Sequence, residues 1–352
     1  MSTRVYAGAG HWTSVGEDAQ PGGLFRLTVG DDRWECLGGG LPPDADVRAI
    51  AIHPNDPRVI YAGTQHGAYR SDDGGDTWSA TGALDAGATV WSFRFHPRDP
   101  EVIYAGTAPP AVYRSEDRGQ TWERMPGLRP PGRVAMNFPC RVTRIAIDPT
   151  HPDEIYAGLE VDGVLRSMDG GKSWEDVSGD LAKLSERPHL RSRIASDTEM
   201  EGMLDSHALC ISSAAPGVVF LAVRMGLFQS ADRGATWTDM EIGRFSPLTY
   251  ARDVTVSPHD PRTLVACLSV AARGDDGSLY RSQDLGRTWR RLDHGVKAEG
   301  TMMAVALHPA DPDQMYCATR SGQVFGTKDG GATWREHRLP DGARDVYTIA
   351  CV

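Results

Sequence analysis

Residues 71–78 of this chain read SDDGGDTW, and this short stretch decides the fold because it recurs. Related octets are SEDRGQTW at 115–122, SMDGGKSW at 167–174, SADRGATW at 230–237, SQDLGRTW at 282–289 and TKDGGATW at 327–334. Every copy keeps Ser or Thr first, then Asp two residues later, Gly four later, Ser or Thr six later and Trp seven later. The other acidic residue changes freely, because Asp76 is replaced by Gln120, Lys172, Ala235, Arg287 and Ala332.

The retained positions suit a tight turn better than a calcium loop. A calcium loop of the EF-hand type needs a bidentate Glu at its twelfth position, which is Gly82 here. In a turn, the Asp carboxylate can accept hydrogen bonds from the turn's own backbone, the Gly can adopt a positive φ, and the Trp ring can be buried. We therefore predict that these octets, called boxes below, are structural.

The boxes belong to a longer repeat. They start 44, 52, 63, 52 and 45 residues apart, and most follow an apolar segment such as VIYAGT at 59–64 and a Pro-rich turn such as HPNDP at 53–57. Each unit therefore reads as four short strands with strong turn signals and no helical period. A repeat of this length and composition predicts the blade of a β-propeller.

The two ends of the chain supply a seventh blade. Residues 5–34 contain the later strands of a unit and a degenerate box, VGDDRW, whereas DVYTIACV at 345–352 resembles a first strand with nothing after it. We predict an all-β fold in which residues 1–352 form a single seven-bladed β-propeller of four-stranded blades. The C-terminal strand would pair with the N-terminal blade, and residues 178–206 would be an inserted loop over the mouth of the channel.

The box pattern S/T-x-D-x-G-x-T/S-W resembles the Asp-box of BNR-repeat propellers. This group includes sialidases, xyloglucan-degrading glycoside hydrolases, the luminal domain of sortilin and photosystem II assembly factors. The resemblance covers essentially the whole chain and implies a propeller with each box on a peripheral turn between the third and fourth strands. The chain departs from the sialidases, which have six blades and an Arg-Ile-Pro motif, and from the xyloglucan enzymes, which use two rings.

Composition excludes several classes of function. The chain has 352 residues and a formal net charge of −10, which argues against a nucleic-acid-binding surface. It has no run of 18 apolar residues, so we expect no membrane span. The N-terminus lacks a basic start followed by an apolar stretch, so we expect a cytoplasmic protein.

Comparison of the blades with one another locates a candidate site. Aligned on the Pro-rich turns, the first strands place these residues near one mouth of the channel: Arg48, Trp91, Thr143, His207, Arg252, Met303 and Tyr347. Two positions later, every residue is apolar: Ile50, Phe93, Ile145, Leu209, Val254, Val305 and Ile349. The apolar column suits packing between blades, whereas the mixed column suits a ligand site or a polar channel that holds only water.

Loops between second and third strands should reach the same mouth. They carry His11, Trp12, Gln65, His66, Glu160, Asp162, Arg224 and Arg320, and the inserted loops carry Asn137, His189, Glu199, Glu201 and Asp205. We expect Arg48, Arg224, Arg252 and Arg320 to converge with Trp91 and His66 as substrate-binding residues. Arginine clusters favour carboxylate or phosphate groups, so a small anionic molecule is the expected partner.

The candidate catalytic residues are His207, Glu160, Glu201 and Tyr347. His207 could act as a general base oriented by Asp205 or Glu201, and Glu160 with Glu201 could form a carboxylate pair for glycoside hydrolysis. His11, His66, His207 and Glu160 could instead hold a metal, but no fixed spacing supports this and we assign neither a metal nor a cofactor.

Two functions follow from this reading. The first is a hydrolase or lyase that acts on a small anionic substrate, such as a carboxylated sugar, at the channel mouth. The second is a non-catalytic binding or assembly protein that recognises a protein partner through the same face, with rim residues such as Phe138, Met225 and Phe245.

Overall fold

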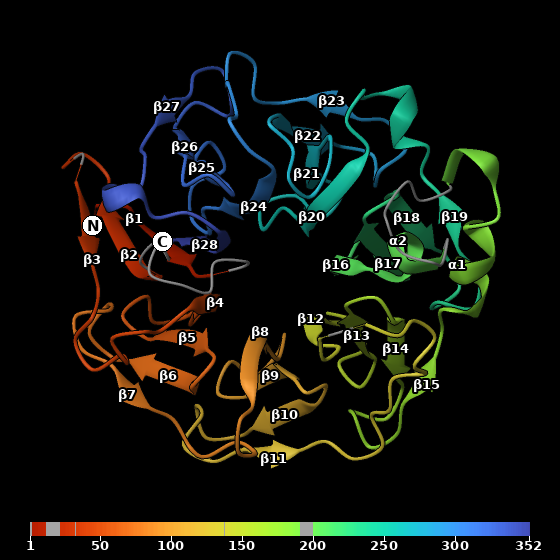
Figure 1. Cartoon of the computed structure of the whole chain (residues 1–352), viewed down its shortest axis with the longest axis horizontal. Helices are drawn as coiled ribbons and strands as arrows, with labels where there is room; N and C mark the ends of the chain where they lie inside the picture. The colour runs from red at the N-terminus through yellow and green to blue at the C-terminus, as the bar shows by residue number, and fades with distance from the viewer. Residues whose placement is uncertain (1, 12–21, 32, 137, 191–199) are drawn as a thin grey trace.

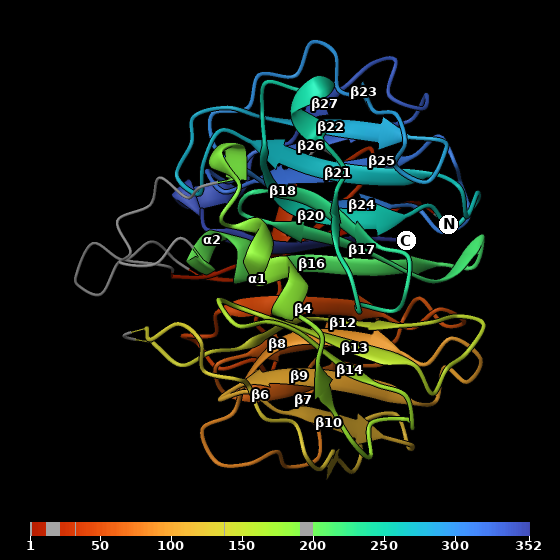
Figure 2. The same cartoon turned by 90° about the vertical axis from the view of Figure 1, so that its right-hand side faces the viewer.

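The chain folds into seven antiparallel four-stranded sheets arranged around one axis (Figure 1). This computed structural model describes residues 2–11, 22–31, 33–136, 138–190 and 200–352. Each sheet is one blade of a propeller, with its first strand next to the axis and its fourth at the periphery. Seen from the side, the strands run across the thickness of the ring, along its axis (Figure 2). Successive residues of an inner strand therefore lie at different depths of the channel.

The strands fall into four concentric sets. The innermost strands are β4 (Val47–Ile52), β8 (Thr89–Phe95), β12 (Val142–Ile147), β16 (Ser206–Ser212), β20 (Tyr250–Val256), β24 (Met302–Leu307) and β28 (Val346–Cys351). The second strands are β1 (Arg4–Ala9), β5 (Ile60–Thr64), β9 (Ile103–Ala108), β13 (Ile155–Leu159), β17 (Ala215–Val223), β21 (Leu264–Ser269) and β25 (Met315–Thr319). The third strands are β2 (Gly23–Thr28), β6 (Gly67–Ser71), β10 (Val112–Ser115), β14 (Gly163–Ser167), β18 (Gly226–Ser230), β22 (Gly277–Ser282) and β26 (Val324–Thr327). The outer strands are β3 (Trp34–Cys36), β7 (Ser79–Ala80), β11 (Glu123–Arg124), β15 (Glu175–Asp176), β19 (Thr238–Asp239), β23 (Arg290–Arg291) and β27 (Arg335–Glu336).

Burial follows this order because the blades pack face to face. Strands β5, β9, β13, β21 and β25 are buried along their whole length, whereas β7, β11, β15, β23 and β27 are exposed. The buried strands carry the YAG-type sequences, since both of their faces meet a neighbouring blade. The core is therefore a series of apolar layers between blades rather than one central mass.

The predicted closure of the ring is confirmed. Strand β28 pairs antiparallel with β1, with Val5 opposite Cys351 and Ala7 opposite Ile349. Arg4 and Val352 then exchange two backbone hydrogen bonds of 2.7 and 3.0 Å. The sheet order β28-β1-β2-β3 completes the N-terminal blade and covers an edge that would otherwise be open to other chains.

Each box is a turn that satisfies its own carboxylate. In the first box, Asp73 accepts hydrogen bonds from the Thr77 backbone N–H at 2.9 Å, the Thr77 hydroxyl at 2.6 Å and the Ser71 hydroxyl at 2.8 Å. Ser71 also accepts the Gly75 N–H, whose residue has a φ of 97°, and the Trp78 indole donates to the Gly75 carbonyl. The carboxylate is thus occupied by the turn itself, as expected for a structural element.

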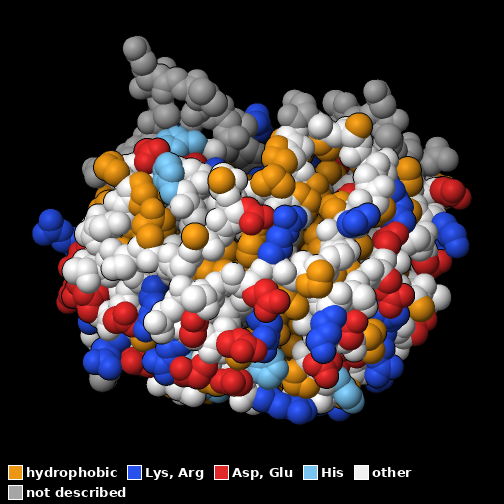
Figure 3. Space-filling view, turned by 90° about the horizontal axis from the view of Figure 1, so that it is seen from below, with side chains coloured by type: hydrophobic (Ala, Val, Ile, Leu, Met, Phe, Trp, Pro, Cys, Tyr) orange, Lys and Arg blue, Asp and Glu red, His pale blue; other side chains and the backbone are white. Residues whose placement is uncertain are grey.

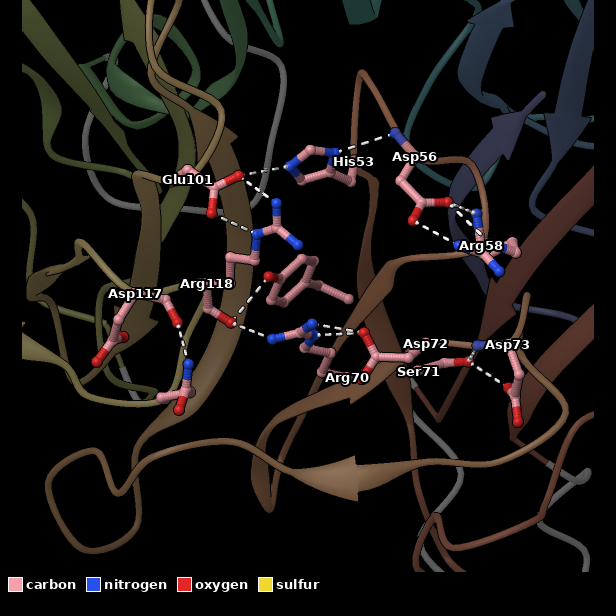
Figure 4. Close-up of polar contacts among 12 residues, drawn as sticks. His53, Asp56, Arg58, Arg70, Ser71, Asp72, Asp73, Glu101, Asp117 and Arg118 are labelled. Carbon is pink, nitrogen blue, oxygen red and sulfur yellow. Dashed lines mark hydrogen bonds and ion pairs between the residues drawn. The ribbon is translucent and has the colours of Figure 1, made fainter.

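The boxes also join neighbouring blades (Figure 4). The Arg118 carbonyl, in the second box, accepts the Tyr61 hydroxyl at 2.9 Å and the Arg70 guanidinium at 3.2 Å from the preceding blade. The Arg118 side chain pairs with Glu101. One blade earlier, the Gly74 carbonyl accepts Tyr6 and Arg26 in the same way. In the fourth box, the Arg233 carbonyl likewise accepts the Arg166 guanidinium at 2.6 Å, so part of this joint recurs there.

The described parts of the insertion before β16 pack against the blades. It contains helix α1 (Gly179–Leu184), the 3-10 turn η1 (Pro188–Leu190) and helix α2 (Met200–Leu204), and two further 3-10 turns are η2 (Ile242–Arg244) and η3 (Pro340–Gly342). Leu181 and Leu184 of α1 and Met203 and Leu204 of α2 join one apolar cluster that includes Trp237 of the following box. These helices extend the core between two blades. Whether the whole segment 178–206 covers the channel mouth stays a prediction.

The outer surface is mixed in charge. Lys, Arg, Asp and Glu side chains are interspersed over the side of the ring seen in Figure 3. Within the described ranges, no helix is long and apolar enough to cross a lipid bilayer.

Candidate ligand site in the central channel

A β-bulge near the start of every innermost strand builds the candidate site. On β4, Val47 pairs with Thr64 and Ala49 with Gly63, so the residue between them is skipped. The other inner strands show the same shift in register. The skipped residues are those of the mixed column: Arg48, Trp91, Thr143, His207, Arg252, Met303 and Tyr347. Because a bulge re-aims its side chain, one residue per blade turns towards the channel.

All seven bulge residues line one cavity of about 80 Å³. Its other lining residues are Ala49, Ile50, Ser92, Phe93, Arg141, Arg144, Glu160 and Thr348. The predicted column therefore does meet in space. The cavity is far smaller than the roughly 300–1,000 Å³ typical of pockets that enclose a drug-sized ligand. It has room for one small polar group and waters.

The Trp91 ring contacts three other residues that line this cavity. The Arg141 guanidinium lies 3.9 Å from the centroid of its ring and the Arg48 guanidinium lies 4.5 Å away, and Tyr347 meets the ring edge-on at 5.6 Å. Both arginines gain cation–π attraction from the indole. Among the described residues, the buried Trp91 Nε1 and Arg48 Nε have no hydrogen-bond partner. Two buried donors thus remain available for an acceptor.

Two arginines of the cavity are paired with carboxylates. Both carboxylate oxygens of Glu160 accept hydrogen bonds from the Arg141 guanidinium, one of them at 2.6 Å. The Asp46 carboxylate lies 3.2 Å from the Arg48 guanidinium and 2.6 Å from the His11 ring. Burial lowers the pKa of Arg141 to about 10, and the charges of Arg252 and Arg48 act in the same direction. These guanidinium groups are therefore close enough to repel one another, and an anion between them would relieve that repulsion.

His207 anchors a second, more buried network. Its Nδ1 donates to the Ala251 carbonyl at 2.7 Å, and its Nε2 lies 3.2 Å from Asp205 and 3.4 Å from the Tyr250 hydroxyl. Burial lowers the pKa of His207, and the Asp205 carboxylate beside its Nε2 opposes this shift. Arg224 closes the network with contacts of 2.8 Å to Asp205 and 3.4 Å to Glu201.

Several predicted site residues lie outside the cavity. Arg224 is committed to Asp205, Arg320 to Asp345 at 2.7 Å in a separate surface pocket, and His66 to Asp44 at 3.0 Å. The expected convergence of four arginines is therefore not what the structure shows: Arg48 and Arg252 line the cavity, whereas Arg224 and Arg320 do not. Each of these two bonds a carboxylate from a segment far away in the sequence.

The expected carboxylate pair is not assembled either. Glu160 lines the cavity, whereas Glu201 on α2 is buried against Arg224, and both are held in ion pairs. His189 bonds Asp239 on the outer strand β19 rather than a residue of the channel. Trp12, Asn137 and Glu199, which were also expected near the mouth, lie outside the described residues.

Sequence reasoning missed Arg141, Arg144 and Ser92. Arg141 immediately precedes β12, and the other two directly follow bulge residues. The positions directly after the mixed column therefore carry a signal that could have found Ser92 and Arg144, whereas Arg141 lies two residues before its bulge residue.

A metal site is not formed by the described residues, which contain no group of three or more His, Cys, Asp or Glu able to hold an ion. The histidines proposed as ligands have separate partners: His11 bonds Asp46, His66 bonds Asp44 and His207 bonds the Ala251 carbonyl.

The fold and channel define a seven-bladed, ring-closed β-propeller with an arginine-rich lumen. A family model described as sortilin, neurotensin receptor 3 (Sortilin-Vps10) matches residues 66–181 and 277–350, which together make up more than half of the chain. The chain therefore belongs to the Sortilin-Vps10 family.

Curated relatives include xyloglucanases. The chain is 26% identical over 358 residues to a xyloglucanase from Hypocrea jecorina, covering 89% of this chain and 35% of that protein. It is 32% identical over 316 residues to xyloglucanase Xgh74A from Acetivibrio thermocellus, covering 82% of this chain and 31% of that protein. This chain thus spans about a third of the length of these relatives.

Solved structures agree on the fold. The GH74 xyloglucanase from Xanthomonas campestris superposes with a TM-score of 0.61 at 20% identity, over 86% of this chain and 46% of that one. YCF48 from Cyanidioschyzon merolae gives 0.58 at 16% identity, over 87% and 88% of the two chains. At these identities, the likeness concerns the fold alone.

Proposed function

We propose that this chain binds a small anionic molecule, such as a carboxylated sugar, in its central channel. The observation that carries the proposal is the convergence of Arg48, Arg141 and Arg252 on one small cavity. The unpartnered Trp91 N–H and Arg48 Nε–H point to the same conclusion, because buried donors are normally matched by acceptors. A carboxylate or phosphate supplies several acceptor atoms and a compensating charge.

The size of the cavity defines how such a ligand would bind. About 80 Å³ accommodates an anionic group but not a sugar chain. The anionic group would enter between the arginines, and the remainder of the molecule would lie along the channel axis. Tyr347, whose pKa burial raises to about 12, stays protonated and can donate a hydrogen bond to the ligand.

Binding is tested by calorimetric titration of the purified chain with glucuronate, galacturonate, acetate and inorganic phosphate. The expected result is binding by wild type that Arg48→Met or Arg252→Met weakens at least about tenfold, the loss expected for one charge-assisted hydrogen bond. Arg290→Met on the exposed strand β23 is the matched control and should bind as wild type does. Equal affinity in all four proteins, or no binding of any anion, contradicts the proposal.

A second candidate function is hydrolysis of a glycosidic bond, or a lyase reaction, at the same site. The similarity to xyloglucanases favours it, together with the contact between His207 and the Asp205 carboxylate at the edge of the cavity. Glycoside hydrolysis by the usual route needs two carboxyl groups beside the bond. Among the described residues, Glu160 is the one carboxylate in the cavity lining, and it is paired with Arg141.

Turnover of xyloglucan and of aryl glycosides, including an aryl glucuronide, tests this candidate. A hydrolase predicts product release that His207→Gln abolishes while the anion still binds. Binding without turnover supports a non-catalytic role. Absence of both, with capture of a protein partner that Arg48→Met prevents, would support the assembly-protein alternative instead.

A further inference from the structure

Arg94 differs from the residues at the equivalent position of the other six inner strands, deeper in the channel than the bulge residues. It lies on β8, three residues beyond the bulge residue Trp91 and next to the end of the strand. The equivalent positions of the other inner strands carry small side chains: Ala51, Ala146, Cys210, Thr255, Ala306 and Ala350. One long cation therefore projects at a level where the other six blades leave space.

The surroundings of Arg94 place its side chain in the lumen. Its surface is exposed to solvent, yet protein encloses it closely enough for burial to lower its pKa. Cys210, two blades away on β16, raises that pKa and Arg144 on β12 lowers it. A side chain that is wetted and yet surrounded by three blades lies in a water-filled channel, and this position reconciles its exposure with its enclosure.

Arg94 has no counter-charge within the described part of the chain. No hydrogen bond or ion pair joins it to another described residue, although it lies near a second guanidinium, that of Arg144. Arg144 donates to Asp253 at 3.0 Å, while its buried Nε has no partner. The other Asp253 oxygen accepts the Val305 N–H at 3.2 Å. Arg94 and Arg144 are thus neighbouring cations, and the Asp253 carboxylate that pairs with Arg144 has partners at both of its oxygens.

Two guanidinium groups that share one channel repel each other, and an anion between them would offset that repulsion. A strand advances about 3.3 Å per residue, so Arg94 lies roughly 10 Å deeper than Trp91 along β8. Arg144 lines the main cavity, and its charge also lowers the pKa of Arg94. It therefore lies between the level of the bulge residues and the level of Arg94.

We propose that the ligand of the channel is elongated and carries two anionic groups, one held by Arg48, Arg141 and Arg252 and the other by Arg94 and Arg144. This proposal rests on the proposed function, because it takes anion binding at the upper cluster as given. It adds the class of the ligand: a linear molecule with an acidic group at each end, lying along the channel axis.

A chain-length series tests the proposal. The full chain is titrated calorimetrically with the dicarboxylates succinate, adipate, suberate and sebacate and with the monocarboxylates butyrate, hexanoate, octanoate and decanoate. We expect the long dicarboxylates to bind at least about tenfold more tightly than the monocarboxylates of equal length, because the second carboxylate gains charge-assisted hydrogen bonds. Succinate, which cannot span the two levels, should bind like butyrate.

Variants assign the effect to Arg94. Arg94→Met should remove the advantage of suberate and sebacate without changing the affinity for butyrate, and Arg94→Lys should restore part of it. Arg48→Met should weaken every ligand. A melting temperature for each variant verifies that it is folded.

The outcomes separate the two proposals. If butyrate and succinate bind and depend on Arg48 but chain length has no effect, or Arg94→Met binds sebacate as wild type does, the elongated dianion is wrong and simple anion binding stands. If no carboxylate in the series binds wild type, the proposed function fails and this inference fails with it.

Discussion

The periphery and the lumen of this propeller differ in what the blades have in common. At the rim, six boxes repeat the same hydrogen bonds around an Asp carboxylate. At the lumen, seven bulges repeat the same backbone irregularity but carry seven different residues. The difference teaches where to look for function in a repeat protein: a shared residue serves the blade, whereas a shared backbone position with unlike side chains is free to serve a ligand.

Removing the ring closure should have the largest effect on stability, because the rim and the lumen both depend on a closed ring of blades. A chain without residues 345–352 loses β28, which pairs with β1 and buries Val346, Ile349 and Cys351. We expect aggregation or loss of cooperative unfolding, measured by size-exclusion chromatography and thermal melting followed by circular dichroism. A monomeric truncated chain with an unchanged melting temperature would refute the structural role of the closure.

Two tryptophans test the contrast directly. Trp78→Ala at the rim removes a buried ring and its hydrogen bond to Gly75, so it should cost about 3–5 kcal/mol of the free energy of unfolding. Trp91→Ala in the lumen should cost clearly less stability but abolish anion binding, since Trp91 supports Arg48 and Arg141. Urea denaturation and calorimetric titration measure the two effects. If both variants lost the same stability and Trp91→Ala still bound the anion, Trp91 would be a structural residue like Trp78.

Acid should affect the rim first. Hydrogen bonds from the turn lower the pKa of Asp73, Asp117, Asp169 and Asp329 to about 2 from the ordinary value of 3.8. A depressed folded pKa contributes stability that is present above the unfolded value and is lost as the pH falls through the folded one. The melting temperature should therefore fall between pH 3.8 and about 2.

Asp73→Asn serves as the control for this acid effect. It should lower stability at neutral pH and reduce the slope of melting temperature against pH in this window, because one of the titrating groups is gone. A slope identical to that of wild type would show that the box carboxylates do not control acid unfolding.

The smallest expected effect is a gain of stability. Arg94→Met removes an enclosed charge without a carboxylate partner near Arg144, so the ligand-free protein should melt at the same or a slightly higher temperature. Arg144→Met is the contrasting variant, because it leaves Asp253 without its arginine and should melt lower. A marked destabilisation by Arg94→Met would indicate a structural role for this side chain.

The fold was predictable from the sequence because its signals are local and repeated. Gly, Pro and Asp define the turns, and the alternation between them gives four strands per unit. The seven residues of the mixed column were found for the same reason, since they keep a fixed spacing from the Pro-rich turns. The bulges that direct these residues inward were not foreseen, because they appear only as a shift in pairing between two strands.

The partners of the charged side chains were beyond the reach of the sequence. Arg224 and Arg320 seemed equivalent to Arg48 and Arg252, but Asp205 and Asp345 neutralise them from segments 19 and 25 residues away. Glu160 was expected as a free catalytic carboxylate and is instead the support of Arg141. Such ion pairs depend on where the side chains point in the folded protein, and an alignment of the blades contains no information on this.

The pairing of β28 with β1 also sets an order of events during synthesis. More than 300 residues separate the end of β3 from the start of β28, and at roughly 5–20 residues per second a ribosome needs roughly 15–60 s to make them. During that time the blade of β1–β3 lacks its inner strand and exposes the edge of β1. This blade is thus among the last of the ring to be finished, although three of its strands are made before the other blades, and it depends on protection by the rest of the nascent chain or by a chaperone until then.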